Sequence, residues 1–480
     1  MSVDTNNAAF QDALNLIQYT RQSVFLTGKA GTGKSTFLRY VCEHTKKKHV
    51  VLAPTGIAAI NAGGSTMHSF FKLPFYPLLP DDPNLSLQRG RIHEFFKYTK
   101  PHRKLLEQIE LVIIDEISMV RADLIDAIDR ILRVYSHNLR EPFGGKQLLL
   151  VGDVFQLEPV VKNDEREILN RAYPTPYFFS ARVFSQIDLV SIELQKVYRQ
   201  TDSVFVSVLD HIRTNTAGAA DLQLLNTRYG SHIEESEADM YITLATRRDT
   251  VDSINEKKLA ELAGEPITFE GSIEGDFPES SLPTSQELVL KPGAQIIFIK
   301  NDFDRRWVNG TIGVIAGIDE EEETIYVITD DGKECDVKRE SWRNIRYRYN
   351  EKTKEIEEEV LGSFTQYPIR LAWAITVHKS QGLTFSRVVI DFTGGVFAGG
   401  QAYVALSRCT SLDGIQLKKP INRADIFVRP EIVNFAGRFN DRQAIDKALK
   451  QAQADVQYAA AARAFDKGDM AVSYTHLTLP

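Results

Sequence analysis

Cysteine and long apolar runs are both scarce in this sequence, and their scarcity excludes several classes of protein. The 480 residues include three cysteines, Cys42, Cys335 and Cys409, which lie far apart and form no C-x-x-C pair. We therefore expect neither a disulfide framework nor a structural zinc site, and this cysteine usage fits a reducing cytoplasm. The longest apolar runs match a buried strand, well short of the roughly 20 residues that span a bilayer. The sequence accordingly predicts no membrane segment and no secretory signal.

A surplus of positive charge is also missing, since the net charge is −7. Acidic residues gather at 319–323 and 355–359, so the negative net charge is concentrated in two segments. Binding of a polyanion depends on local basic and N–H-rich surface, so the net charge does not exclude such a partner. With 43% hydrophobic residues, the chain is long enough for two to four domains. Residues 473–480 are polar and aperiodic, and we expect them to be a disordered end that takes no part in the fold.

The sequence does contain one complete phosphate-loop pattern. Residues 28–35 read GKAGTGKS and match G-x-x-x-x-G-K-[ST]. A short apolar run at 23–27 precedes the pattern, and helical apolar spacing follows it. Strand, glycine loop and helix are the context that a phosphate-binding loop requires, so the sequence predicts that a nucleoside triphosphate is bound here.

Each residue type in this loop has a physical role. Three glycines let the backbone turn so that its N–H groups point at phosphate oxygens, namely Gly28, Gly31 and Gly33. The helix that we expect to begin near Lys34 adds the positive end of its dipole. Lys34 is expected to reach the β- and γ-phosphates, and the Ser35 hydroxyl to ligate Mg²⁺.

Two further apolar runs end in polar residues that suit phosphate chemistry. LVIIDEIS at 111–118 places Asp115 and Glu116 after a strand, where Asp115 would hold Mg²⁺ and Glu116 would orient and deprotonate the attacking water. The alternative is an ordinary solvated turn. LLLVGDVFQLEPV at 148–160 places Gln156 similarly, and its amide can sense the γ-phosphate or position water. The alternative for Gln156 is a loop glutamine bonded to backbone.

The fold class follows from the pattern of apolar runs. Runs with both faces apolar alternate with helical patterns in the first half, at 49–55, 110–116 and 146–154, with a helix expected over 122–136. This pattern predicts an α/β fold with a parallel sheet covered on both sides. Similar runs at 241–248 and 387–392 predict a second domain of the same architecture.

Other segments have a different pattern of apolar and polar residues. Residues 283–362 alternate apolar and polar, and Asn309-Gly310 and Asp331-Gly332 mark tight hairpins. We expect a small antiparallel barrel there, inserted into the second domain. Residues 73–102 predict an irregular insertion in the first domain, and 440–465 predict an Ala-rich terminal helix.

Eight short motifs stand in an order and spacing that resemble a known family. They are GKAGTGKST, APTGIAA (53–59), GGSTMHSFF (63–71), DEISM (115–119), GDVFQLEPV, VYRQ (197–200), HKSQGLTF (378–385) and YVALSR (403–408). They resemble the superfamily-one helicases related to RecD, and most closely the Pif family. Residues 116–136 resemble the signature segment of that family. The resemblance covers roughly residues 8–415. One departure is Glu158, where the family more often has proline.

The resemblance implies two RecA-like P-loop NTPase domains that close on ATP, with a small SH3-like β-barrel insertion in the second. We expect a first RecA-like domain over 1–182, with a small insertion near 65–102, and a second RecA-like domain over 183–282 and 363–430. The barrel is expected over 283–362 and a helical tail over 431–480.

The same resemblance implies the residues of the ATP site. Arg199 and Arg408 match the two arginines of the family, which stabilise charge on the transferred phosphoryl group, and Gln11 matches the position that reads the adenine edge. The expected catalytic residues are Lys34, Glu116, Gln156, Arg199 and Arg408. The expected ATP-binding residues are Gln11, Gly28, Gly31, Thr32, Gly33, Lys34, Ser35, Thr36 and Gly382, and the metal ligands are Ser35 and Asp115.

For DNA the resemblance implies a second set of residues, which are Thr55, Gly56, His68, Ser69, Thr246, His378, Lys379 and Ser380. Phe75 and Arg306 are added to the expected DNA contacts because of their residue types. Hydroxyls, backbone amides and imidazoles at strand ends can follow a phosphate backbone without reading sequence. The aromatic residues Phe70, Phe71, Phe75 and Tyr76 either stack on bases or separate strands, or belong to the core. Arg306, with Arg305 and Trp307, forms either a hairpin tip that touches DNA or a solvated charged turn.

The function implied by the resemblance is an ATP-dependent DNA helicase that moves 5′ to 3′ on single-stranded DNA. ATP and Mg²⁺ are its expected cofactors, and single-stranded, tailed duplex or G-quadruplex DNA its partners. The family suggests repair, recombination and telomere maintenance, in a monomer that is cytoplasmic, or nucleoid-associated if bacterial. Two alternatives stay open, an ATP-driven translocase that displaces proteins without unwinding, and a nucleotide-switched binding protein.

Overall fold

The computed structural model describes residues 4–86, 91–200, 202–231 and 240–451. Within these ranges no helix combines the length and the apolarity that crossing a membrane requires. The helix expected over 440–465 is present over residues 442–451. The rest of that helix and the end at 473–480 lie outside the described residues.

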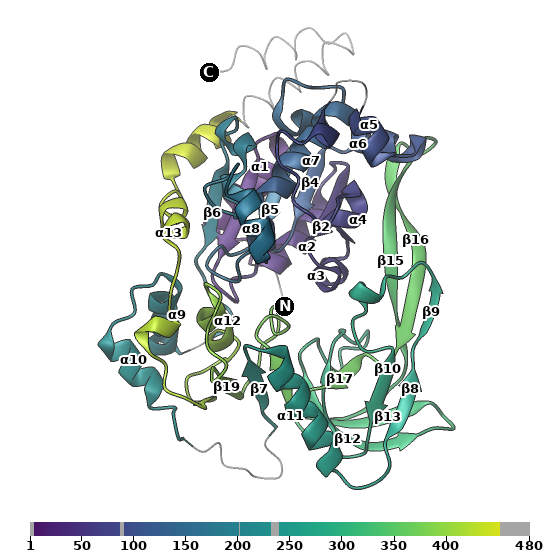
Figure 1. The fold of residues 1–480 in the computed structure, drawn as a ribbon, viewed down its shortest axis with the longest axis vertical. Coiled ribbons are helices and arrows are strands. Elements are labelled where there is room, and N and C mark those ends of the chain that lie inside the picture. The colour runs from purple at the N-terminus through teal and green to yellow at the C-terminus, as the bar shows by residue number, and fades with distance from the viewer. Residues whose placement is uncertain (1–3, 87–90, 201, 232–239, 452–480) are drawn as a thin grey trace.

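A six-stranded parallel sheet forms the first half of the fold (Figure 1). Its strand order is β3-β2-β4-β5-β1-β6. The strands are β1 (Val24–Gly28), β2 (His49–Ala53), β3 (Ser65–Thr66), β4 (Leu111–Ile114), β5 (Gln147–Val151) and β6 (Val190–Leu194). The apolar runs at 49–55, 110–116 and 146–154 each contain one strand, so the prediction of a parallel sheet is confirmed.

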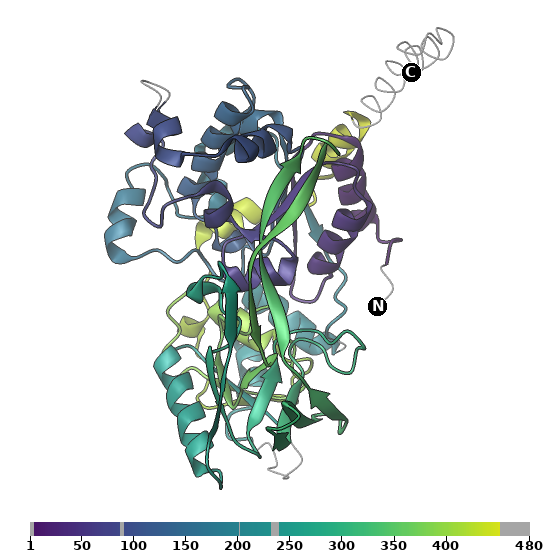
Figure 2. The same cartoon turned by 90° about the vertical axis from the view of Figure 1, so that its right-hand side faces the viewer.

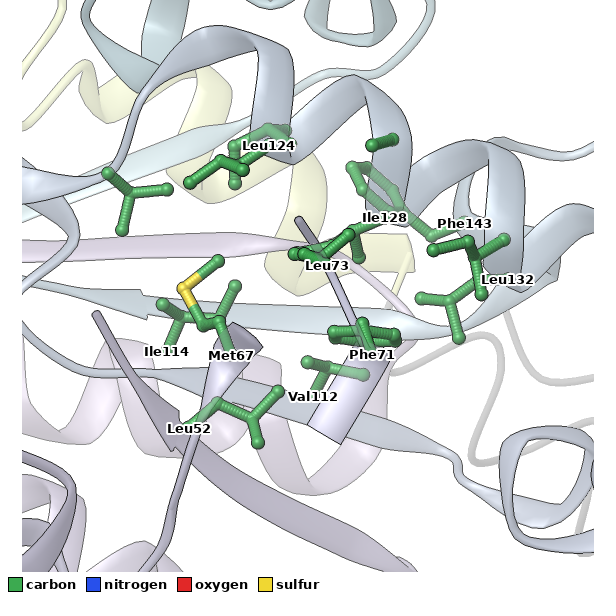
Figure 3. Packing of buried hydrophobic residues seen from close by; sticks show 14 of the residues in the cluster. Leu52, Met67, Phe71, Leu73, Val112, Ile114, Leu124, Ile128, Leu132 and Phe143 are labelled. Atoms are coloured by element: carbon green, nitrogen blue, oxygen red, sulfur yellow. The ribbon is translucent and has the colours of Figure 1, made fainter. Parts of the chain in front are cut away.

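Helices cover both faces of this sheet because alternate strand residues point to opposite sides. Val24 and Leu26 pack beneath α1 (Ala8–Tyr19) and α2 (Lys34–His44). Phe25 points to the other face. The helices on that side are α4 (Met67–Phe71), α6 (Lys100–Gln108) and α7 (Ala122–Tyr135). Figure 3 shows Leu124, Ile128 and Leu132 of α7 packed against Val112 and Ile114 of β4.

Short elements complete this half of the molecule. They are α3 (Gly56–Ala62), α5 (Arg91–Phe96) and α8 (Asn163–Leu169). The insertion that was expected to be irregular over 73–102 is irregular over 73–86 apart from one 3-10 turn, but it contains α5 and the start of α6 over 91–102, where the expectation is wrong. Ile92 and Phe96 on α5 supply a buried apolar face, and this packing gives the segment helical structure.

The last strand of the first sheet lies beyond residue 182, where the second domain was expected to begin. β6 pairs with β1 from Val190 to Leu194, so it extends the first sheet. The chain also returns to this strand near its end. Asn440 N donates to Ser191 O at 3.0 Å, and the Asn440 side chain accepts from Glu193 N at 2.8 Å. We therefore place the boundary between the two halves after β6.

A four-stranded parallel sheet with order β18-β7-β19-β20 forms the centre of the second half. Its strands are β7 (Ile242–Ala245), β18 (Ala374–Thr376), β19 (Val388–Asp391) and β20 (Ile415–Leu417). The runs at 241–248 and 387–392 contain β7 and β19, as expected. The helices of this half are α9 (Ser203–Arg213), α10 (Ala219–Asn226), α11 (Arg248–Glu261) and α12 (Gln401–Leu406). The following helix, α13 (Pro430–Ala436), packs on the core of the first half through Ile432 and Phe435.

Antiparallel strands separate β7 from β18 along the chain. They are β8 (Ile267–Glu270), β9 (Ser272–Gly275), β10 (Glu287–Leu290), β11 (Gln295–Phe298), β12 (Ile312–Asp319), β13 (Thr324–Thr329), β14 (Glu334–Val337), β15 (Glu340–Asn350), β16 (Glu355–Gln366) and β17 (Ile369–Leu371). Asp331-Gly332 joins β13 to β14 as predicted. Asn309-Gly310 is not a tight hairpin, because β11 ends at Phe298 and β12 begins at Ile312.

The long ribbon of β15 and β16 reaches from this antiparallel region to the first half of the molecule (Figures 1 and 2). Tyr347 and Tyr349 of β15 are buried in the core beneath the first sheet's helices. Tyr347 also lies beside β2, where its hydroxyl accepts from Val51 N at 3.3 Å. The two halves are therefore connected through this ribbon as well as through the returning C-terminal segment.

Candidate active site

The phosphate loop lies between β1 and α2 and is shaped by three glycines. Gly28, Gly31 and Gly33 have φ values of 154°, 78° and 89°, a region that favours residues without Cβ. Lys34 opens α2, and its Nζ donates to Gly28 O at 2.7 Å and to Lys29 O at 3.0 Å. The lysine ammonium thus lies within the concave side of the loop, where a phosphate would meet it.

Glu116 follows β4 in a strained backbone conformation beside Lys34. Its φ of 49° and ψ of 42° are unfavourable for a residue with a side chain, and such strain often marks functional sites. Asp115 Oδ1 accepts from Glu116 N at 2.9 Å. Burial and the neighbouring Asp115 raise the pKa of Glu116 to about 7, against the opposing charges of Lys34 and Arg408. Burial also raises the pKa of Asp115.

This raised pKa predicts a pH dependence of hydrolysis. If Glu116 acts as the base, only its carboxylate form is active, so kcat/KM for ATP should rise as the pH increases through about 7 and level off above it. Below that value the rate should fall about tenfold per pH unit. The measurement is kcat/KM between pH 5.5 and 9 with ATP affinity determined at each pH. A profile without an inflection near neutrality, at constant ATP affinity, would rule out this assignment.

Two arginines approach the loop from outside the first sheet. Arg199 covers the loop so closely that a Cβ on Gly31 would lie 2.4 Å from Arg199 Cβ, and Tyr198 N donates to Gly31 O at 2.9 Å. Arg408 follows α12 and is 2% exposed. Burial and the charge of Arg199 lower the pKa of Arg408 to about 9, while the charge of Glu116 opposes this. The structure therefore brings both arginines together with the loop and the acidic pair.

Arg408 also contacts the segment that was predicted to bind DNA. Its guanidinium donates to Val404 O at 3.0 Å and to Ser380 O and Leu383 O at 3.3 Å each. Ser380 and Leu383 flank the glycine at position 382, which has φ 78° and open space around its Cα. One arginine thus joins the predicted ATP site to the HKSQG segment.

The sequence interpretation missed Arg213, which closes a buried ionic network. Arg213, at the end of α9, pairs with Asp153 at 3.0 Å and with Glu193 at 2.9 Å. Its guanidinium also lies 4.4 Å from the centre of the Phe155 ring. Asp153 belongs to the GDVFQLEPV motif, but no sequence pattern indicated its basic partner, which stands 60 residues away.

Other contacts join the phosphate loop directly to the second half. Lys29 pairs with Asp210 of α9, and Ala30 N donates to the Tyr403 hydroxyl of α12 at 3.0 Å. Movement of α9 or α12 would therefore be transmitted to the loop.

The departure from the family pattern, Glu158, has partners of its own. It pairs with Arg429 at 2.7 Å and accepts from the Tyr177 hydroxyl at 2.8 Å. Arg429 precedes α13, which returns to the first sheet.

The remaining predicted ATP-site residues occupy different surroundings. Gln11 lies on α1 and donates to Thr5 O at 2.6 Å. Thr32 is buried and donates to Lys29 O at 3.0 Å. Ser35 is exposed and Thr36 half-buried on the first turn of α2. Gln156 is 8% exposed in the loop after β5, which puts it at the boundary between the two halves.

On the first half, the residues predicted to bind DNA lie on α3 and α4. The Thr55 hydroxyl caps α3 by accepting from Ala58 N at 3.2 Å. Gly56 is covered by the antiparallel region, since a Cβ there would lie 2.4 Å from Ser281 Oγ. Ser69 is exposed. His68 stacks on Phe75 with 5.0 Å between ring centres.

The predicted aromatic contacts divide between surface and core. Phe75 is 82% and Tyr76 50% exposed, whereas Phe70 and Phe71 are buried. Phe70 and Phe71 therefore belong to the core, and the idea that they stack on bases is wrong.

On the second half, the predicted DNA contacts follow β7 and β18 at neighbouring strand ends. The Thr246 hydroxyl is buried and has no hydrogen-bond partner among the described residues. Burial lowers the pKa of His378. Lys379 is exposed. The Ser380 hydroxyl is fully buried and donates to Val377 O at 2.7 Å, so its side chain is already bonded within the protein.

Arg306, another predicted DNA contact, lies in the antiparallel region between β11 and β12. Its guanidinium pairs with Asp302 at 2.8 Å and with Asp336 at 2.7 Å. The side chain of Trp307 is 5% exposed and stacks on Phe298. Arg306 therefore belongs to a charged turn that Trp307 anchors in the antiparallel region. Both carboxylates would compete with a DNA phosphate for its guanidinium.

The fold and the site together define a class. A phosphate loop on one parallel sheet, covered by two arginines and contacted by a second parallel-sheet unit, is the arrangement of a P-loop motor enzyme. Residues 4–217 match the family model described as PIF1-like helicase.

Similarity to known proteins extends over most of the chain. It is 33% identical over 412 residues to the ATP-dependent DNA helicase Pif1 of Campylobacter jejuni, covering 82% of this chain and 88% of that protein. The chain belongs to the PIF1-like helicase family.

Solved structures of Pif1 from Bacteroides sp are also similar. The complex with ADP-AlF4 superimposes with a TM-score of 0.83 at 40% identity, covering 91% of this chain and 97% of that one. The complex with ssDNA has a TM-score of 0.65 at 40% identity, covering 92% and 99%.

Proposed function

We propose that this protein is an ATP-dependent DNA helicase that moves 5′ to 3′ along single-stranded DNA and unwinds duplex or G-quadruplex DNA. The observation that carries the proposal is the position of Arg408. The charges of Arg199 and Glu116 act on its guanidinium, which also donates to Ser380 O at 3.3 Å, so the ATP site and the segment proposed to bind the strand share one side chain. A nucleotide switch needs no such link to a strand-binding segment.

The residues of the ATP site are proposed to act as follows. Lys34 and the loop N–H groups bind the β- and γ-phosphates, and Glu116 accepts a proton from the attacking water. Arg199 and Arg408 stabilise charge on the transferred phosphoryl group, and Gln156 senses it. Gln11 reads the adenine edge, as the resemblance implies.

The acidic pair also fits a magnesium ion. Asp115 and Glu116 are neighbouring carboxyl groups with raised pKa values, so a nearby cation would favour their ionised forms. A carboxylate, a hydroxyl and phosphate oxygens are ligands that Mg²⁺ accepts. Asp115 and Ser35 would hold the ion, which when bound neutralises phosphate charge.

DNA is proposed to pass along the strand ends of both halves. Thr55, Ser69 and Phe75 would contact it on the first half, and the residues after β7 and β18 on the second. We further propose that the antiparallel region is an SH3-like barrel and that the enzyme acts as a monomer. Quadruplex unwinding and the 5′ to 3′ polarity rest on the family resemblance.

Tailed duplexes test the proposed function. The protein with ATP and Mg²⁺ should separate a duplex with a 5′ single-stranded tail at least about tenfold faster than one with a 3′ tail, because a motor of fixed polarity must load on one strand. Strand separation is followed by fluorescence, and single-stranded DNA should stimulate ATP hydrolysis.

Each outcome of this assay tests a different part of the proposal. Preference for the 3′ tail would refute the polarity. Displacement of a bound protein without strand separation would identify a translocase. Absence of any DNA stimulation of ATP hydrolysis would refute the motor.

A further inference from the structure

A large apolar side chain is exposed where the two halves meet. Phe397 lies in the loop between β19 and α12 and is 61% exposed. A single exposed apolar residue is common on protein surfaces, so its exposure alone carries no conclusion. Its surroundings are what distinguish it.

The loop of Phe397 lies at the strand ends that were predicted to contact DNA. β18, β7 and β19 are parallel neighbours, so the segments that follow them emerge at the same edge of the sheet. A Cβ on Gly394 would lie 3.2 Å from Thr246 Oγ1. The Phe397 ring stacks on His378, with 6.5 Å between ring centres and 16° between planes. The exposed ring therefore lies beside His378, on a loop that passes Thr246 at Gly394.

The backbone that carries Phe397 is held in place. Phe397 N donates to the side-chain oxygen of Gln401 at 3.2 Å, and Gln401 is fully buried. Gly400 has φ 77°, and a Cβ there would lie 2.3 Å from Phe155 O and 2.4 Å from Gln156 O. A ring presented on a fixed backbone loses little entropy when a ligand covers it.

The first half carries a matching arrangement. Phe75 is 82% exposed and stacks on His68 with 11° between the planes. Each half thus presents an exposed phenylalanine backed by a histidine from a predicted DNA-binding segment. Proteins that bind single strands without sequence preference use such aromatic faces, because every base has a π-face.

We propose that Phe397 stacks on a base of single-stranded DNA and forms, with Phe75, a pair of stacking platforms on the two halves of the motor. This inference rests on the proposed function, because it names a further contact for the same strand. The platforms would bind bases by stacking on their faces, which every base has, and not by reading the sequence. Such binding suits a motor that moves along any strand.

A cycle of protein and DNA variants tests the proposal. Single-stranded oligonucleotides with normal bases and with a run of abasic sites are compared by fluorescence anisotropy. Phe397→Ala should weaken binding of the normal strand about tenfold and weaken binding of the abasic strand far less. Phe397→Trp should restore binding of the normal strand. Phe303→Ala is the matched control, because Phe303 is 95% exposed in the antiparallel region, and it should bind like the unsubstituted protein.

The outcomes separate this inference from the proposed function. Equal weakening on normal and abasic strands would mean that Phe397 only supports the loop, and normal affinity of Phe397→Ala would mean that it does not contact the strand. Either result overturns the stacking role while leaving the helicase proposal intact. Failure of the unsubstituted protein to bind single strands would instead overturn both.

Discussion

Replacing Lys34 with alanine is expected to reduce ATP hydrolysis about a thousandfold or more. The Lys34 ammonium lies 2.7 Å from Gly28 O and 3.0 Å from Lys29 O, in the concave side of the phosphate loop. Burial lowers its pKa, and the charges of Asp153 and Glu116 oppose that shift. Removing the cation that the loop holds between its own carbonyls takes away charge compensation for the β- and γ-phosphates in a buried site, where electrostatic interactions are strong. Phosphate release with and without single-stranded DNA is the measurement.

Binding of single-stranded DNA should survive in Lys34→Ala, because the predicted strand contacts lie on other elements. Lys104→Ala provides a matched control for the loss of one lysine, since Lys104 lies on the surface of α6 and pairs only with Glu107 among the contacts described. Lys104→Ala should hydrolyse ATP at the normal rate. Normal hydrolysis by Lys34→Ala would overturn the assignment of the site.

Replacing Arg408 with alanine is expected to lower kcat by about 10³ to 10⁵. If Arg408 acts on the transferred phosphoryl group as proposed, its guanidinium stabilises charge that develops only in the transition state, so kcat should fall far more than ATP affinity. The rate of DNA-stimulated hydrolysis and the affinity for a fluorescent ATP analogue are measured separately.

Loss of Arg408 also removes contacts with three backbone carbonyls, so its structural effect has to be separated from its catalytic effect. Arg408→Lys keeps a cation but lacks the planar fork of donors, and it should fold while remaining strongly impaired. The melting temperature and circular dichroism of both variants report folding. A folded Arg408→Ala variant with normal kcat would refute the role.

The two halves of the molecule are joined by contacts that also connect the proposed sites. Arg213 links Asp153 to α9, and Tyr403 links α12 to the phosphate loop. Arg199 donates to Ser407 O, and the neighbouring Arg408 donates to Ser380 O. Buried ionic and hydrogen-bonded groups have few alternative partners, so separating the halves would leave charges unpaired. These contacts give a physical route by which hydrolysis could change the grip on DNA.

The local parts of the ATP site could be predicted from the sequence because their chemistry depends on neighbours along the chain. Strand, glycine loop and helix follow one another within 24–44, and the acids follow β4 directly. Arg199 and Arg408 could be named only through the family resemblance, since 208 residues separate Arg199 from the Ser407 carbonyl that it contacts. Apolar runs separated by helical patterns predicted parallel sheets, but they could not show that β6 joins the first of them.

By itself, the sequence determined that this protein has a phosphate loop, a parallel-sheet core and the ordered motifs of a PIF1-like helicase. Only the tertiary structure decided that Arg213 closes the Asp153 network, that Phe70 and Phe71 are core, and that Phe397 is exposed. The physical reason is that burial and ionic pairing depend on groups brought together from distant parts of the chain. Local sequence sets backbone preferences, whereas the environment of a side chain is fixed by whatever packs against it.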